Sequence, residues 1–137
     1  MTSVREPDIV ERDSVAVMLR RVPDELPAIQ RTWAEVETAV GLRGRHFFGA
    51  FDEAANEYLV CVAAKEGDDA GAIGLEAAEL PGGRFARLRL SGEPPGVYER
   101  IGPGFAQLLA AFPHDPSRMQ IEHYRRFDEI DLLLPIV

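Results

Sequence analysis

Glu122 is the residue of this chain best suited to chemistry, because it interrupts a segment with the apolar and aromatic pattern of a β-strand. The segment reads Ile121-Glu122-His123-Tyr124. Side chains alternate between the two faces of a strand, so Glu122 and Tyr124 are expected on one face and His123 on the other. A carboxylate among aromatic side chains is poorly solvated, which raises its pKa and suits it to proton transfer or to binding a cation. The alternative is a solvated glutamate on an edge strand.

Aromatic residues are the second group that could contact a small molecule. Most of them are expected in the core, since Trp33 and Phe105 lie at matching positions of two predicted helical stripes. Tyr98 is a stronger candidate, because it opens the second helix beside a Pro/Gly-rich loop. Aromatic faces next to a buried carboxylate are suited to planar, lipophilic cations. The predicted ligand-binding residues are Glu122, Tyr124, Tyr98, Trp33 and Phe48.

Other kinds of site find little support in the sequence. His46, His114 and His123 lack the spacing of metal ligands, and Cys61 lies in an apolar run typical of a core strand. No glycine pattern opens a helix after a strand as a phosphate-binding loop does, and no serine lies in a nucleophile elbow. We therefore predict no metal and no cofactor.

Composition narrows the class of protein. The chain has 137 residues, of which 46% are hydrophobic, and a formal net charge of −8. These values are typical of one globular domain, and the acidity argues against direct nucleic-acid binding or a basic membrane-surface helix. A single cysteine and a polar N-terminus without an apolar signal-peptide core indicate a cytoplasmic protein. Nothing in the pattern indicates an oligomeric state.

An internal repeat organises the elements expected to position these side chains. Apolar residues at helical spacing recur 72 residues apart, at positions 29/101, 33/105 and 36/108, and the apolar run 58–62 recurs at 130–134. A duplicated unit packs around a pseudo-twofold axis and leaves a natural cleft between its halves. Glu122 has no acidic counterpart, since offsets of 72 and 73 lead to Ala50 and Gly49. A charge that breaks the repeat favours a functional role.

The first half reads as strand, helix, strand, strand. Its helix runs from a cap at Asp24 to about residue 40. The strands are expected at 9–22, with a bend near Asp13, at 46–51 and at 58–64. A segment of linker composition, 65–74, follows.

The second half repeats this order. Its helix is expected from about residue 97 to 112, with an irregular opening at Gly102-Pro103-Gly104. Its strands are expected at 75–80, 84–90, 119–125 and 130–136. The pseudo-repeats thus cover about 9–65 and 75–137 of a single domain spanning 1–137. The predicted fold class is α+β, with duplicated units related by pseudo-twofold symmetry, one antiparallel sheet and two main helices.

Three stretches carry a family resemblance: Phe47-Phe48-Gly49-Ala50-Phe51 before Glu57-Tyr58, then Glu79-Leu80-Pro81-Gly82-Gly83-Arg84-Phe85-Ala86, and Ile121-Glu122-His123-Tyr124 followed by Asp131-Leu132-Leu133-Leu134-Pro135-Ile136. With the duplicated layout they resemble the GyrI-like small-molecule-binding domain, the effector-binding domain of many bacterial multidrug-responsive regulators, over nearly the whole chain. The resemblance implies that Glu122 projects into an aromatic-walled ligand cleft between the halves.

The resemblance leaves three functions open. Some stand-alone members are hydrolases that open the cyclopropane ring of DNA-alkylating natural products, others follow a DNA-binding helix-turn-helix, and a few modulate gyrase. A first strand near Ile9 leaves no room for a DNA-binding domain, so a stand-alone member is expected. The first function is binding of aromatic or lipophilic, cationic molecules with Glu122 as counter-charge. The second is cyclopropane hydrolysis with Glu122 as general base and Tyr124 orienting the substrate. The third is a gyrase-modulating interaction.

Overall fold

The structure is a computed structural model that describes residues 6–137. The predicted absence of a signal peptide rests largely on residues 1–5, which lie outside the described part. In chain order the elements are β1 (Asp8–Arg12), β2 (Val15–Pro23), α1 (Leu26–Val40), β3 (Phe47–Asp52), β4 (Glu57–Ala63), η1 (Gly71–Ile73), β5 (Glu76–Leu80), β6 (Gly83–Ser91), η2 (Gly96–Arg100), α2 (Ile101–Ala111), β7 (Gln120–Arg126) and β8 (Glu129–Pro135). Here η marks a short 3-10 turn.

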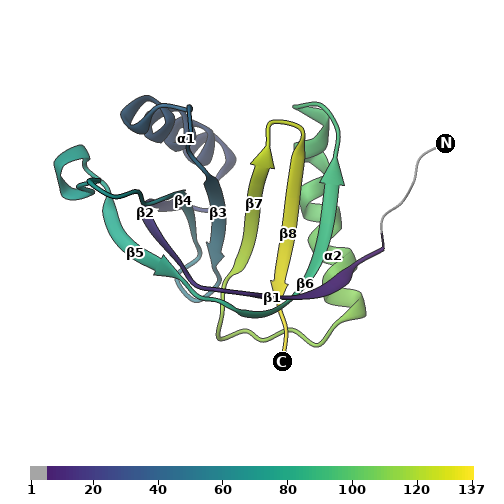
Figure 1. Cartoon of the computed structure of the whole chain (residues 1–137). Coiled ribbons are helices and arrows are strands. Elements are labelled where there is room, and N and C mark those ends of the chain that lie inside the picture. Colours follow the sequence, from purple (N-terminus) through teal and green to yellow (C-terminus); the bar gives the residue numbers. More distant parts are fainter. Residues whose placement is uncertain (1–5) are drawn as a thin grey trace.

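The strands form one curled antiparallel sheet in the order β1-β6-β8-β7-β3-β4-β2-β5 (Figure 1). The units β2-α1-β3-β4 and β6-α2-β7-β8 meet at the β3–β7 pair in the middle. The two outer strands are exchanged between the units. β1, which precedes the first unit in the chain, pairs with β6 of the second unit, and β5, which precedes the second unit, pairs with β2 of the first. The predicted α+β fold of duplicated units is confirmed.

The two faces of the sheet have different partners. On one face α1 packs on β2 and β4, while α2 packs on β6 and β8. The helical stripes predicted from the repeat lie against the sheet, and Val36 and Leu108 at matching positions are both fully buried. On the other face one apolar cluster joins residues of β2, such as Leu19, to Phe85 of β6. These strands are far apart in the sheet order, so the sheet must curl around the cluster.

Local differences from the predicted elements have physical reasons. The bend near Asp13 is a complete break that sends β1 to the far end of the sheet, beside β6. The predicted cap by Asp24 is wrong, because α1 begins at Leu26 with Glu25 in the N-cap position and no capping bond from its side chain. The irregular opening predicted at Gly102-Pro103-Gly104 is wrong in place, because these residues are part of the α-helix α2. The tightened turn comes before them, as η2. None of the described helices is long and apolar enough to cross a membrane.

Candidate functional site

Glu122 lies in the middle of the sheet, on β7, directly opposite Gly49 of β3. Three cross-strand pairs of these two strands share its face: Phe47/Tyr124, Gly49/Glu122 and Phe51/Gln120. This is the face covered by the helices, because Trp33 of α1 packs against both members of the first pair. The carboxylate therefore lies where the two units meet.

Aromatic side chains from both units surround Tyr124, the neighbour of Glu122 on this face. The Tyr124 ring centroid lies 5.2 Å from that of Trp33 and 6.4 Å from that of Tyr98, both edge to face. Phe47 adds a further edge contact to Trp33 at 6.0 Å. Tyr98 is 47% exposed, while Trp33 and Tyr124 are partly buried. The cluster thus joins the two halves and reaches the molecular surface.

Among residues 6–137, hydrogen bonds reach only one oxygen of the Glu122 carboxylate. Oε1 accepts a hydrogen bond from Tyr58 Oη at 2.6 Å and another from Tyr124 Oη at 2.5 Å. Within residues 6–137, Oε2 has no hydrogen-bond partner, and no basic side chain lies within 4.0 Å of the carboxylate. Burial raises the pKa of Glu122, and the bonds from Tyr124 and Tyr58 offset only part of that rise. The site holds a poorly solvated carboxylate with one free oxygen.

The two tyrosines act as hydrogen-bond donors. Burial, followed by the charge of Glu122, raises the pKa of Tyr58 and of Tyr124 well above the usual value for a phenol. Both hydroxyls therefore keep their protons at physiological pH, and both point them at the same carboxylate oxygen. Their hydrogen bonds both go to Oε1 of Glu122 and do not involve Oε2.

Gly49 makes room for this arrangement. A Cβ at this position would lie 1.9 Å from Tyr58 Oη and 2.6 Å from Glu122 Oε1, so only glycine lets the tyrosine cross β3. Gly49 is also the counterpart of Glu122 at an offset of 73, and the two residues face each other across the β3–β7 pair. Two glutamates at these positions would place like charges side by side. The repeat thus differs at one pair of facing positions, where the first unit has Gly49 and the second unit has Glu122.

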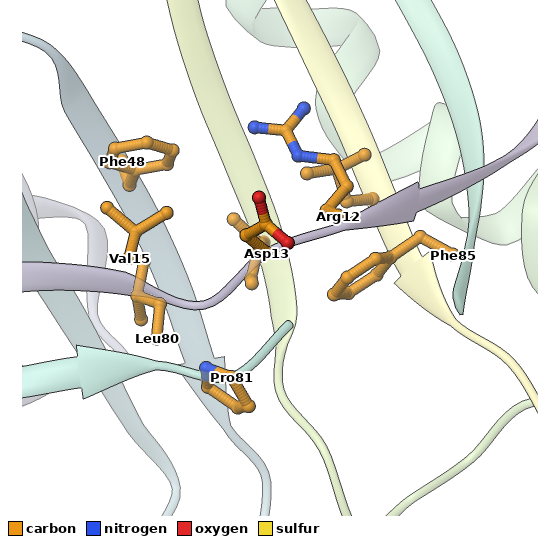
Figure 2. A pocket seen from close by; sticks show the side chains of 9 residues that line it. Arg12, Asp13, Val15, Phe48, Leu80, Pro81 and Phe85 are labelled. Carbon is orange, nitrogen blue, oxygen red and sulfur yellow. The ribbon is translucent and has the colours of Figure 1, made fainter. Parts of the chain in front are cut away.

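The prediction that Phe48 lies beside Glu122 is wrong, because Phe48 is on the opposite face of the sheet from the other predicted residues. It pairs with His123 and stacks on it, with ring centroids 4.5 Å apart, on the opposite face of the sheet. Figure 2 shows it inside the curl, lining a cavity with Val15 and Leu80. That cavity holds only about 10 Å³, room for about one water molecule. Neighbouring residues of a strand point to opposite faces, so Phe47, and not Phe48, lies next to Tyr124 on the face of Glu122.

Tyr58 and Gly49 also lie at this candidate site, and neither was predicted from the sequence. For Tyr58 the sequence does contain a signal. Tyr58 opens an apolar run whose repeat counterpart is Ile130. A polar tip at an apolar repeat position is the feature that singles it out. For Gly49, the sequence shows only that no acidic residue lies there.

His123 and Cys61, on the strands near Glu122, are both uncharged at neutral pH. Arg12 lies 3.0 Å from Nδ1 of His123, and burial first, then the Arg12 charge, lowers the pKa of His123 to about 4, so the ring is neutral. Burial raises the pKa of Cys61 to about 12, which keeps it a thiol. No cluster of three metal-ligating side chains occurs among the described residues.

Comparisons with known proteins show the fold. No protein-family model and no curated protein matches the sequence. An integron cassette protein from Vibrio cholerae matches with a TM-score of 0.74 at 14% identity, covering 98% of this chain and 97% of that one. SAV2435 bound to tetraphenylphosphonium matches with a TM-score of 0.69 at 10% identity, covering 97% and 94%. A hydrolase from Listeria innocua matches with a TM-score of 0.56 at 9% identity, covering 99% and 94%.

These likenesses define a two-unit α+β fold that several differently described proteins share. At the level of overall architecture it agrees with the GyrI-like domain that the sequence resembles.

Proposed function

We propose that this protein is a cytoplasmic binder of aromatic or lipophilic small molecules, preferring cationic ones, at the cluster around Glu122. The observation that carries the proposal is the carboxylate of Glu122, which lies among Tyr58, Tyr124 and Trp33 and has no ion-pair partner within residues 6–137. Water solvates a partly buried carboxylate poorly, so a cation that spreads its charge over apolar groups can replace that solvation at low cost. The exposed ring of Tyr98 adds a surface for cation–π contact.

The similar fold of SAV2435 supports the choice of ligand class. That protein has been solved with tetraphenylphosphonium, a cation whose charge is covered by four phenyl groups. The two tyrosine hydroxyls fix the carboxylate of Glu122 without neutralising it, which suits a ligand of this kind. The net charge of −8 further favours cations over anions near the protein.

A matched pair of ligands tests the proposal on the wild-type protein. Isothermal titration calorimetry with tetraphenylphosphonium and with neutral triphenylphosphine oxide compares a cation with an uncharged molecule of similar aromatic surface. We expect the cation to bind at least about tenfold more tightly, the equivalent of one charge-assisted contact. Equal affinities, or tighter binding of the oxide, would contradict recognition of charge.

Hydrolysis of a strained ring is a second candidate function. The observation in its favour is the free Oε2 of Glu122 on a carboxylate with a raised pKa, which suits a general base acting on water. In this reaction water adds across the opened bond, its oxygen to one carbon and a proton to the other. A chromatographic time course with a planar, cyclopropane-bearing DNA-alkylating compound tests it. Hydration by the wild type and not by Glu122→Gln would establish an enzyme, and an unchanged compound would dismiss it.

A further inference from the structure

A group of charged side chains lies inside the curl of the sheet, on the opposite face from Glu122. This face is marked on each strand by a side chain of the apolar cluster inside the curl, such as Phe85 on β6 and Leu133 on β8, and by every second residue from it. The charged residues that β1, β6, β7 and β8 place there are Asp8, Arg12, Arg87, Arg89, Arg125, Glu129 and Asp131. We call these seven residues the inner charged cluster.

Three of the four arginines of the inner charged cluster are matched by its three acids. They donate hydrogen bonds in the pairs Arg87–Asp8, Arg89–Asp131 and Arg125–Glu129. The fourth arginine, Arg12, has no carboxylate within 4.0 Å among residues 6–137. Asp13, next in the chain, is exposed and lies beyond that distance as well. The cluster therefore has one positive charge more than its own acids balance.

His123 of β7, and not an acid, holds the Arg12 guanidinium. Nη2 of Arg12 lies 3.0 Å from Nδ1 of His123. A guanidinium only donates hydrogen bonds, so Nδ1 accepts, and the neutral ring carries its proton on Nε2. The imidazole is fixed in turn by stacking on Phe48, with ring centroids 4.5 Å apart. A neutral acceptor thus orients the guanidinium without cancelling its charge.

The other N–H groups of Arg12 are free to meet a ligand. Neither Nε nor Nη1 has a hydrogen-bond partner among residues 6–137. Both atoms reach the solvent, since His114 Nε2 is the one buried side-chain nitrogen or oxygen without a partner in this range. Burial lowers the pKa of Arg12, which the charge of Asp131 opposes and the charges of Arg87 and Arg125 reinforce. An anion beside Arg12 would therefore stabilise a poorly solvated cation.

The charges around Arg12 favour an anion with a single negative charge. The acids of the inner charged cluster stay in place beside their arginines, and Asp13 lies next to Arg12 in the chain. A phosphate dianion would meet more repulsion from these acids than a carboxylate does. A carboxylate also has two oxygens in the geometry of two parallel N–H groups of a guanidinium.

Apolar side chains next to Arg12 can contact the rest of such a ligand. Val10 precedes Arg12 by two residues on the same face of β1, and Val15 lines a small cavity together with Arg12. Both valines pack against the apolar cluster inside the curl and are only partly buried. The surroundings of Arg12 therefore suit an acid with an apolar body.

We infer that the inner charged cluster binds a small monocarboxylate with an apolar body, whose carboxylate accepts hydrogen bonds from the free N–H groups of Arg12. His123 is a positioning residue, and Arg87 and Arg125 add attraction without leaving their own acids. The inference goes beyond the function proposed for Glu122, because this site lies on the other face of the sheet and takes a ligand of opposite charge.

Hexanoate and hexanamide test this site, because they share a chain and differ in charge. NMR titrations at neutral pH follow the Arg12 Nε–H signal and the ring C–H signals of His123. We expect hexanoate to bind wild type about five- to tenfold more tightly than hexanamide. The ratio should fall to about one in Arg12→Gln. Arg84→Gln is the matched control, since it removes an exposed arginine from the other face of β6 and should keep the ratio.

A second variant separates the charge of Arg12 from its shape. Arg12→Lys keeps the charge and loses the planar pair of donors, so it should keep only part of the preference for hexanoate. Absence of hexanoate binding, equal affinities of the two ligands for wild type, or a ratio that Arg12→Gln preserves would overturn the site. Inorganic phosphate that shifts the same signals at lower concentration than hexanoate would overturn the ligand class. If Arg12→Gln does not fold, the two wild-type titrations and Arg12→Lys still decide.

Discussion

Replacing Glu122 with glutamine is expected to weaken tetraphenylphosphonium binding about 10- to 100-fold, the value of a hydrogen-bonded or paired charge. Binding of triphenylphosphine oxide should change less than about threefold, as for a contact without charge. Glutamine has the shape of glutamate, and its amide oxygen can still accept from Tyr58 and Tyr124. The substitution therefore removes the charge and little else. Calorimetric titration of both ligands into both proteins gives the four affinities, and equal losses for the two ligands would contradict charge pairing.

The stability of Glu122→Gln provides the folding control for this experiment. Because the pKa of Glu122 is raised in the folded protein, the ionised carboxylate costs stability. Protonated Glu122 contributes fully to the free energy of unfolding when the pH is below the pKa that Glu122 has in the unfolded chain. This contribution is lost as the pH rises through the higher pKa that Glu122 has in the folded protein. Glu122→Gln should therefore melt at a higher temperature than wild type at neutral pH, and the difference should disappear in acid.

Gly49→Ala is expected to destabilise the protein by about 1–3 kcal/mol, the usual cost of overpacking. Gly49 is in a strand without a positive φ, so alanine fits the backbone there and the cost comes from its Cβ. That atom would displace Tyr58 and break its bond to Glu122. Chemical denaturation measures the stability, and the variant should also bind tetraphenylphosphonium more weakly.

A double-mutant cycle separates this clash from a general effect on β3. Tyr58→Ile places at position 58 the residue type that the repeat has at Ile130, and it removes the ring that Gly49 admits. In that background Gly49→Ala should cost clearly less, because only the approach of its Cβ to Glu122 Oε1, at 2.6 Å, remains. A cost that is the same in both backgrounds would show that the Tyr58 ring is not what requires glycine.

The fold could be predicted from the sequence because its signals are local and occur twice. Apolar residues at helical spacing define both helices, and alternation places Glu122 and Tyr124 on one face. The repeat then fixes the common order of elements. The exchange of β1 and β5 between the units could not be predicted, because strand pairing over such distances leaves no pattern in either strand alone.

The site was predicted only in part, for reasons of geometry. Within β7, alternation suffices, so Glu122 and Tyr124 are placed correctly relative to each other. Phe47 and Phe48 are adjacent and chemically alike, and only the β3–β7 register shows which of them shares the face of Glu122. Tyr58 reaches Glu122 across an intervening strand, a contact that depends on the missing side chain of Gly49.

The role of Glu122 as an ionised counter-charge can be measured at the carboxylate itself. The side-chain carboxyl carbon, observed by carbon-13 NMR and assigned with Glu122→Gln, reports the pKa of Glu122 in the free protein and in the protein saturated with tetraphenylphosphonium. We predict a raised pKa in the free protein and a lower pKa in the complex, because a cation that binds the ionised form stabilises that form in return. A pKa of Glu122 that saturation leaves unchanged, or raises further, would contradict the proposed site.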